Sequence, residues 1–192
     1  MEKELTNEER LVLISDMISR AKKNFAHGSS FHFLLWGWVI SLANFGHYVL
    51  DKFDLYEIPF IVWLITIPAA FASFWYGFKK TKNANAKSHI DKVYSSLWIS
   101  ITVMVAICLI FMGKLGFNHN PIIMLFTGLG TFVSGILMRY KPIIYGGVIL
   151  WVGACMGLMT TITNQQLIAG IVVILGHLIP GYMLRSAEKR NV

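Results

Sequence analysis

Six long stretches of this chain contain no Asp, Glu, Lys or Arg, and apolar side chains dominate each of them. They are residues 30–50, 58–78, 93–112, 121–138, 143–161 and 167–184. A helix needs about 20 mostly apolar residues to cross ~30 Å of hydrocarbon. A single charged residue at its centre costs roughly 2.5 to 3.5 kcal/mol. The pattern therefore predicts an all-α fold, a polytopic transmembrane helix bundle with six spans.

The composition supports lipid as the solvent of this chain. Of the 192 residues, 55% are hydrophobic and 14% are charged, and the mean hydropathy is +0.58. These values lie outside the range usual for soluble domains. The net charge of +7 does not indicate a nucleic-acid partner, because the cations lie between apolar runs and not on one water-exposed face. We expect the lipid bilayer to be the immediate partner and no nucleic acid to bind.

The distribution of Lys and Arg predicts the orientation. With six spans, 15 of the 17 Lys and Arg residues fall at the two termini and in the even-numbered loops, which lie on one side of the membrane. Only Lys52 and Lys114 fall in the odd-numbered loops, on the opposite side. Cationic segments stay cytoplasmic, so we expect a multi-pass protein of the cell (inner) membrane with both termini cytoplasmic. No apolar run starts before Phe31, so we expect no cleaved signal and a first span that directs its own insertion.

The polar N-terminal segment carries a helix signal. Thr6 and Glu9 have the S/T-x-x-E spacing of a capping box. Apolar residues then recur every three or four positions, at Leu11, Ile14, Ile18, Ala21 and Phe25. We expect residues 1–28 to form a cytoplasmic amphipathic helix, residues 29–185 a transmembrane domain and residues 186–192 a cytoplasmic tail. The helix would lie on the inner leaflet, or dock on a cytoplasmic partner or a second copy of the chain.

Polar side chains are rare in the spans and are the first candidates for function. Asn44 and His47 lie on one helical stripe with Ser41 and Asp51. One interpretation is structural, with Asn44 joining two helices and His47 hydrogen-bonded between them. The other is an external metal or proton site, completed by outer-loop residues. No metal-ligand spacing supports that site, so we predict no metal.

The sixth span contains His177 and Pro180, and the second contains Pro68. Each proline lacks an N–H and should break its helix. His177 shares a helical face with Gly170 and Gly181, so it should point into the bundle. There it would donate to a neighbouring carbonyl, or titrate within a pathway. In transporters, two broken helices can build a midplane binding site.

Glycines on the fifth predicted span indicate close helix packing. Gly153 and Gly157 form a small-xxx-small pair, and Gly146 lies on the same face. Such residues allow two backbones to approach closely. The two cysteines, Cys108 and Cys155, lie in apolar segments without a CxxC or His-rich neighbour, so neither a disulfide nor a cofactor is indicated.

The outline of six spans, with Ser134 in the fourth and His177 in the sixth, resembles that of rhomboid intramembrane proteases. That family carries Gly-x-Ser-Gly, whereas here the string is Phe132-Val133-Ser134-Gly135, and a long first loop is missing. An intramembrane hydrolase is therefore only a remote alternative. We predict no catalytic residue and no enzyme.

Several strings across the chain resemble those of a group of uncharacterised bacterial six-span membrane proteins. They are Leu35-Trp36-Gly37-Trp38, Arg139-Tyr140-Lys141-Pro142 and Ile179-Pro180-Gly181-Tyr182. The resemblance implies the six-span topology and no particular activity, substrate or cofactor. We expect a non-enzymatic regulatory or scaffold subunit, with a small transporter or channel for an unidentified solute as the alternative.

Overall fold

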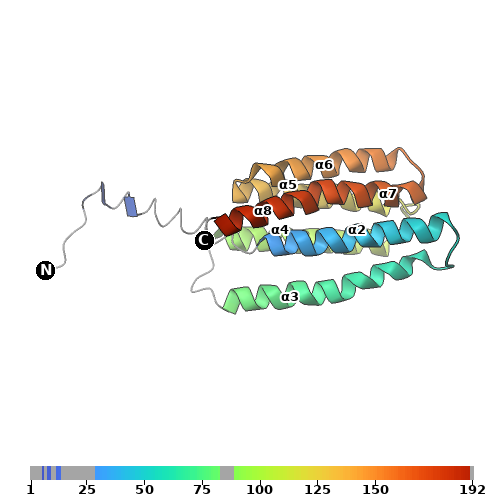
Figure 1. Cartoon of the computed structure of the whole chain (residues 1–192), viewed down its shortest axis with the longest axis horizontal. Helices are drawn as coiled ribbons and strands as arrows, with labels where there is room; N and C mark the ends of the chain where they lie inside the picture. Colours follow the sequence, from blue (N-terminus) through green and yellow to red (C-terminus); the bar gives the residue numbers. More distant parts are fainter. Residues whose placement is uncertain (1–5, 7, 10–11, 14–28, 83–88, 191–192) are drawn as a thin grey trace.

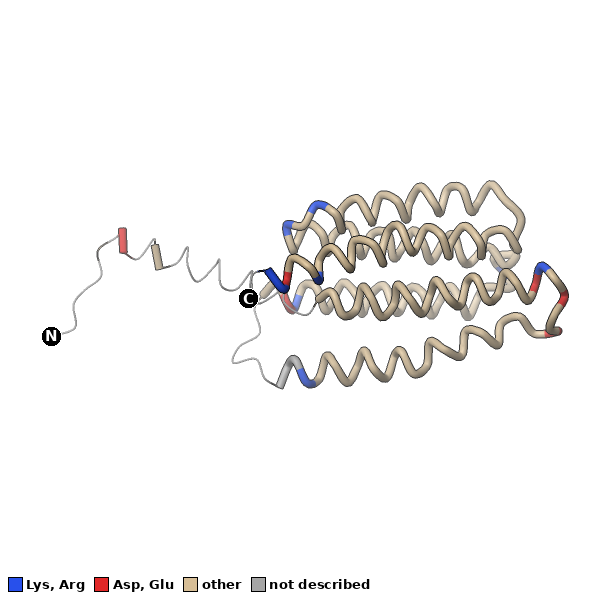
Figure 2. Tube along the Cα trace, in the orientation of Figure 1, with Lys and Arg blue, Asp and Glu red and all other residues tan. Residues whose placement is uncertain are grey.

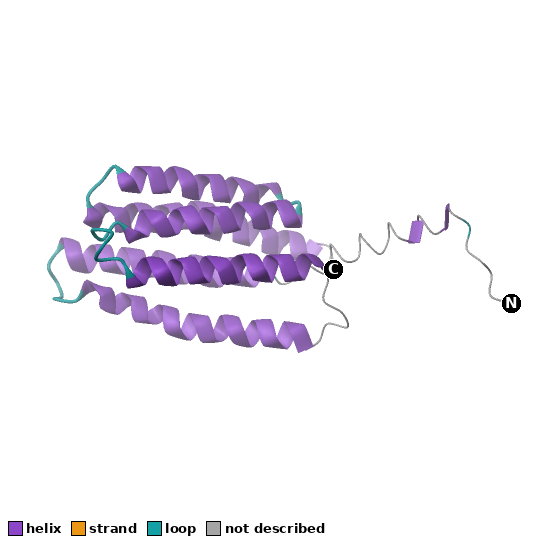
Figure 3. Ribbon diagram, turned by 180° about the vertical axis from the view of Figure 1, so that it is seen from behind, coloured by secondary structure: helices purple, strands orange, loops and turns teal. Residues whose placement is uncertain are grey.

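The computed structural model describes residues 6, 8–9, 12–13, 29–82 and 89–190, and this part of the chain contains helices and no strand. In chain order the elements are α2 (Ser30–Lys52), the 3-10 segment η1 (Pro59–Ile65), α3 (Thr66–Lys82), α4 (His89–Ile110), α5 (His119–Met138), α6 (Lys141–Leu158), α7 (Ile162–Val173), the π-helical segment η2 (Ile174–Leu178) and α8 (Ile179–Arg190). The helices lie side by side along one long axis (Figure 1), and short loops join them at the two ends (Figure 3).

Six helical segments in the described residues are long and apolar enough to cross a membrane. They are α2, η1 with α3, α4, α5, α6, and the continuous run of α7, η2 and α8. The predicted all-α class with six such helices is confirmed. Thr6 and Glu9 form the two reciprocal hydrogen bonds of the capping box, at 2.8 and 3.3 Å. The rest of the predicted amphipathic helix lies outside the described residues.

The charged residues separate to the two ends of the bundle (Figure 2). Most Lys and Arg of the described chain lie at the end where α2 begins and α8 ends. The opposite end carries Lys52 and Lys114 together with Asp51, Asp54 and Glu57. The helical middle is free of charge, which is the condition for placing it in hydrocarbon.

The helical hydrogen-bond pattern changes near Pro68 and near Pro180. Pro68 is the third residue of α3. The first N–H groups of an α-helix have no partner within the helix, so the N–H that Pro68 lacks is not missed there. The segment before α3 is a 3-10 helix instead of an α-helix. Before Pro180 the helix widens to a π-turn, in which the N–H of Ile179 bonds to Ile174 O. Pro180 offers no N–H to the carbonyl of Gly176, and that carbonyl lies against Gly146 of α6.

The core is built by α2, α5, α6, α7 and α8. One apolar cluster joins α5, α6 and α7 through Met124, Leu150, Ala154, Ala169, Val172 and Val173. A second, with Phe33, Ile143 and Leu184, lies where α2, α6 and α8 meet. The segments η1–α3 and α4 are peripheral. Only 6% and 11% of their apolar stretches are buried, against 39% to 56% in the other four.

Gly146→Ala should destabilise the bundle, because a Cβ at this position would overlap with Gly176 O. Forced overpacking typically costs about 1 to 3 kcal/mol. Gly77→Ala is the matched control, since a Cβ there meets nothing within 4 Å and alanine is the better helix former. The check is the thermal unfolding midpoint of both variants in the same detergent. Equal midpoints would show that α6 and η2 are not in close contact.

Candidate functional site

Three buried amides join α2, α5 and α7 at the end of the bundle where Lys52 and Lys114 lie. Asn120 Nδ2 donates to Asn44 Oδ1 and to Gln166 Oε1, each at 2.8 Å. Asn44 Nδ2 donates to Ile40 O one turn back, also at 2.8 Å. That bond fixes which atom of the Asn44 amide faces α5, so the side chains are held in one orientation. We call Asn44, Asn120 and Gln166 the amide triad.

Further polar contacts surround the amide triad. Gln165 Nε2 donates to Asn118 Oδ1 at 2.7 Å, and Thr163 Oγ1 donates to Asp51 Oδ2 at 2.5 Å. Within the described residues, three buried polar atoms have no hydrogen-bond partner. They are Ser41 Oγ, His119 Nδ1 and Gln165 Oε1. A buried polar atom without a partner carries a desolvation cost, which a bound polar group would offset.

His47 connects the peripheral η1 segment to α2. Its Nδ1 accepts a hydrogen bond from Trp63 Nε1 at 3.0 Å, and its ring makes an edge contact with Phe60, with centroids 4.7 Å apart. Because Nδ1 is the acceptor here, the neutral ring carries its proton on Nε2. The buried His47 therefore holds two aromatic residues of η1 against α2.

His177 lies in the π-turn and is buried at a junction of four elements. Its Nδ1 is 3.4 Å from Thr131 Oγ1 of α5. The Thr131 hydroxyl already donates to Thr127 O at 2.7 Å, so its oxygen is left to accept from His177. The imidazole also contacts Phe33 and Trp98, with ring centroids 5.0 and 6.4 Å away.

Ser134 lies one turn from Thr131, and its hydroxyl is engaged elsewhere. Its Oγ donates to Gly130 O at 2.6 Å and accepts from Trp98 Nε1 at 3.2 Å. A nucleophilic serine has to give its proton to a base. Here the proton points along the serine's own helix, and the atom beside His177 Nδ1 belongs to Thr131.

The predicted packing glycines lie against other helices. A Cβ at Gly153 would come within 2.5 Å of Val172, and one at Gly157 would be 3.0 Å from Pro121. A Cβ at Gly170 or Gly181 would be 2.9 Å from Phe45 or 3.0 Å from Phe33. All four distances are shorter than a relaxed contact between carbon atoms. These positions permit the helix spacing at which the amide triad forms near one end of the bundle and His177 reaches Thr131 farther along it.

Two members of the amide triad were missed in the sequence. Asn120 and Gln166 each lie one residue before a predicted span, so their polar side chains were assigned to loops. In the structure α5 begins at His119 and α7 at Ile162, and both amides are buried. The adjacent pair Gln165 and Gln166, placed directly before an apolar run, was the available signal.

Metal-ligating residues do not gather in the part of the chain that the structure describes. No group of three or more His, Cys, Asp or Glu side chains there could hold a metal ion. Both cysteines are free, Cys108 buried and Cys155 exposed. The polar clusters consist of amides, hydroxyls and imidazoles, with the Asp51 carboxylate bonded to Thr163 beside them, and such groups suit helix association or binding of a polar group.

No protein-family model, curated protein or solved structure matches the chain. The functional conclusion therefore depends on the arrangement of its own side chains.

Asn120→Ala should weaken the bundle, because it leaves Asn44 Oδ1 and Gln166 Oε1 without their shared donor. A double-mutant cycle of Asn120→Ala with Gln166→Ala isolates the pair, and we expect a coupling of about 0.6 to 1.7 kcal/mol. Unfolding in mixed micelles with increasing denaturing detergent measures it. The control is Thr102→Ala, whose exposed hydroxyl bonds within α4 to Trp98 O. Additive effects of the first two substitutions would mean that the hydrogen bond between Asn120 and Gln166 contributes no coupling energy.

Proposed function

We propose that this chain is a non-enzymatic subunit of the cell (inner) membrane, a regulatory or scaffold protein with both termini cytoplasmic. The separation of charge in Figure 2 supports the placement. Cationic segments remain on the cytoplasmic side during insertion, and the first long helix, α2, begins and the last, α8, ends at the cationic end of the bundle. The partner would be another transmembrane helix, from a second copy or a different subunit.

The exposed face of α4 is the observation that carries this proposal. Ser96 and Ser100 lie one turn apart on this face, followed by the exposed Val103 and Ile107. Two small residues four positions apart let a second helix approach closely and hydrogen-bond. In contrast, the hydroxyls of Thr131 and Ser134 are buried inside the bundle. A small, polar stripe directed away from the core supports lateral binding of a partner.

The weak burial of α3 and α4 supports the same proposal. Four helical segments complete the core, and the other two present large apolar surfaces such as Phe71, Phe74 and Trp75 of α3. A helix that contributes little to its own bundle is free to contribute to an assembly. Binding of a cytoplasmic protein through residues 1–28 stays a prediction, because nearly all of that segment lies outside the described residues.

A small transporter or channel is the second candidate, and the break in the sixth helix favours it. The π-turn places the buried His177 beside Thr131, and π-turns are frequent at functional sites. The three unpartnered polar atoms near the amide triad are also sites where a polar solute could bond. Under this proposal Asn44 and His177 would line the path.

A photo-crosslinking residue at Ser100 should yield a discrete protein adduct in intact membranes. The matched control is Val152 of α6, whose side chain is also exposed on the outside of the bundle but belongs to a core helix. Replacing Ser96 with Ile should reduce crosslinking at Ser100 without lowering stability, because position 96 is exposed. Equal adducts at both sites, or lipid adducts alone at Ser100, would contradict the proposal.

A flux assay separates the two candidates. For the scaffold, purified protein in liposomes should move no solute, and His177→Ala should leave the background leak unchanged. The transporter requires measurable flux that His177→Ala or Asn44→Ala alters at equal expression. Such a result would replace the first proposal with the second.

A further inference from the structure

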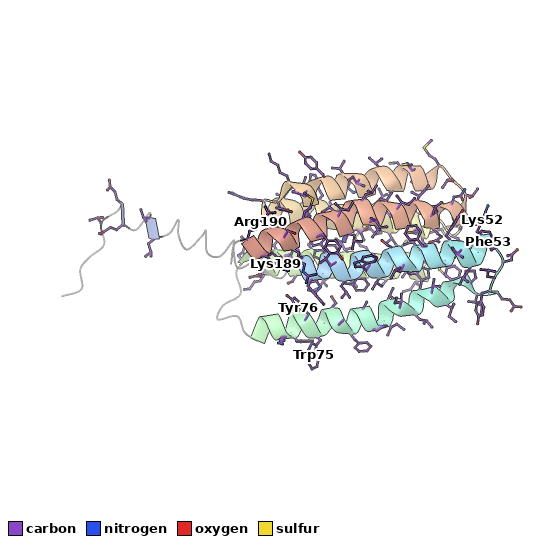
Figure 4. All side chains as sticks on the ribbon, viewed as in Figure 1. Lys52, Phe53, Trp75, Tyr76, Lys189 and Arg190 are labelled. Carbon is purple, nitrogen blue, oxygen red and sulfur yellow. The ribbon has the colours of Figure 1, made fainter. Side chains whose placement is uncertain are left out.

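An open groove of about 880 Å³ lies at the cationic end of the bundle, between α2, α3 and α8. Its volume is within the range of about 300 to 1,000 Å³ that is usual for small-molecule sites. Figure 4 labels two of its lining residues, Tyr76 and Lys189. The groove lies on the flank of the bundle, so in the proposed placement it opens toward the lipid.

The inner wall of the groove is apolar and aromatic. Leu34, Leu35 and Val39 of α2 line it. Two pairs of aromatic residues also line it. Trp38 Nε1 donates a hydrogen bond of 3.1 Å to Tyr182 Oη, and Phe31 stacks on Tyr76 with ring centroids 4.1 Å apart. Trp and Tyr are typical of the boundary between hydrocarbon and headgroups. The wall therefore suits an acyl chain.

The charged residues that line the groove are two cations, Arg185 and Lys189, and one acid, Glu188. Arg185 and Lys189 are exposed, one turn apart on α8, and both line the groove. The nearby acid, Glu188, is engaged at the start of α2. Its Oε1 accepts from Ser30 N at 3.0 Å and its Oε2 accepts from Ser30 Oγ at 2.6 Å. A carboxylate is favourable at a helix N-terminus. Both carboxylate oxygens therefore face donors of α2, and the two cations with one carboxylate leave the lining with a net positive charge that attracts an external anion.

We propose that this groove binds one anionic phospholipid. The phosphate of the headgroup lies between Arg185 and Lys189, and an acyl chain follows Leu34, Leu35 and Val39. Basic residues beside the cytoplasmic surface attract anionic lipids, and basic pockets between helices bind their headgroups. The inference rests on the membrane placement proposed above and is independent of the α4 partner.

Native mass spectrometry of the full-length protein, purified in detergent, tests this proposal. The probes are phosphatidylglycerol and phosphatidylcholine with identical acyl chains. We expect the wild type to retain phosphatidylglycerol preferentially. Arg185→Ala with Lys189→Ala should weaken its binding by roughly 10- to 30-fold, at about a factor of five per basic residue.

Two further variants show whether the groove itself is the site. Lys92→Ala with Lys141→Ala removes two exposed cations near the starts of α4 and α6, at the same end and outside the groove, and should leave lipid retention unchanged. Leu35→Trp fills the wall while keeping every charge and should also weaken binding.

Three outcomes would overturn the proposal. They are equal retention of the two lipids, equal losses in the two charge variants, and a dimer that forms through Arg185 and Lys189 in place of lipid binding. A failure of the α4 proposal can be told apart from these outcomes. In that case no protein adduct forms at Ser100, whereas lipid retention is unchanged.

Discussion

Hydrocarbon offers a backbone N–H or C=O no water to bond with, and each group left unpaired there costs several kcal/mol. A helix meets this constraint because it pairs the groups within one segment. The six apolar, charge-free segments of this chain are helical, and the cations lie at their ends. The α pattern changes only near Pro68 and Pro180, and in the second case the carbonyl that loses its donor lies against the backbone of Gly146.

The next level of organisation follows from the same solvent. Apolar surface gains little by leaving lipid for another helix, so association depends on close packing and interhelical hydrogen bonds. The core uses both, with the glycines of α6 at its closest contacts and the amide triad between α2, α5 and α7. The segments α3 and α4 join the core by single contacts, such as the hydrogen bonds from Trp98 of α4 to Ser134 and from Trp36 of α2 to Ser73 of α3, and bury little of their apolar stretches. The serine stripe on α4 faces away from the core, and on this we base the proposed lateral assembly.

The sequence predicted what depends on one segment at a time. The number of helices follows from local composition, and the capping box follows from the spacing of Thr6 and Glu9. The neighbours of each helix depend on contacts between distant residues, which no local pattern encodes. The amide triad was missed for this reason. Asn120 and Gln166 look like loop residues until α5 and α7 are placed beside Asn44, where each amide replaces water as the other's partner. The contact between His177 and Thr131 was missed for a similar reason, because it depends on the π-turn that contains His177.

We propose that the charge-free helices cross the bilayer while their cationic connections stay in the cytoplasm. Reporters of compartment fused after Lys82 and after Leu115 test it directly, because one position follows the cationic end of α3 and the other follows α4 at the opposite end of the bundle. We expect a cytoplasmic signal after Lys82 and an external signal after Leu115. The same compartment at both positions, or a chain that stays in solution without detergent, would contradict it.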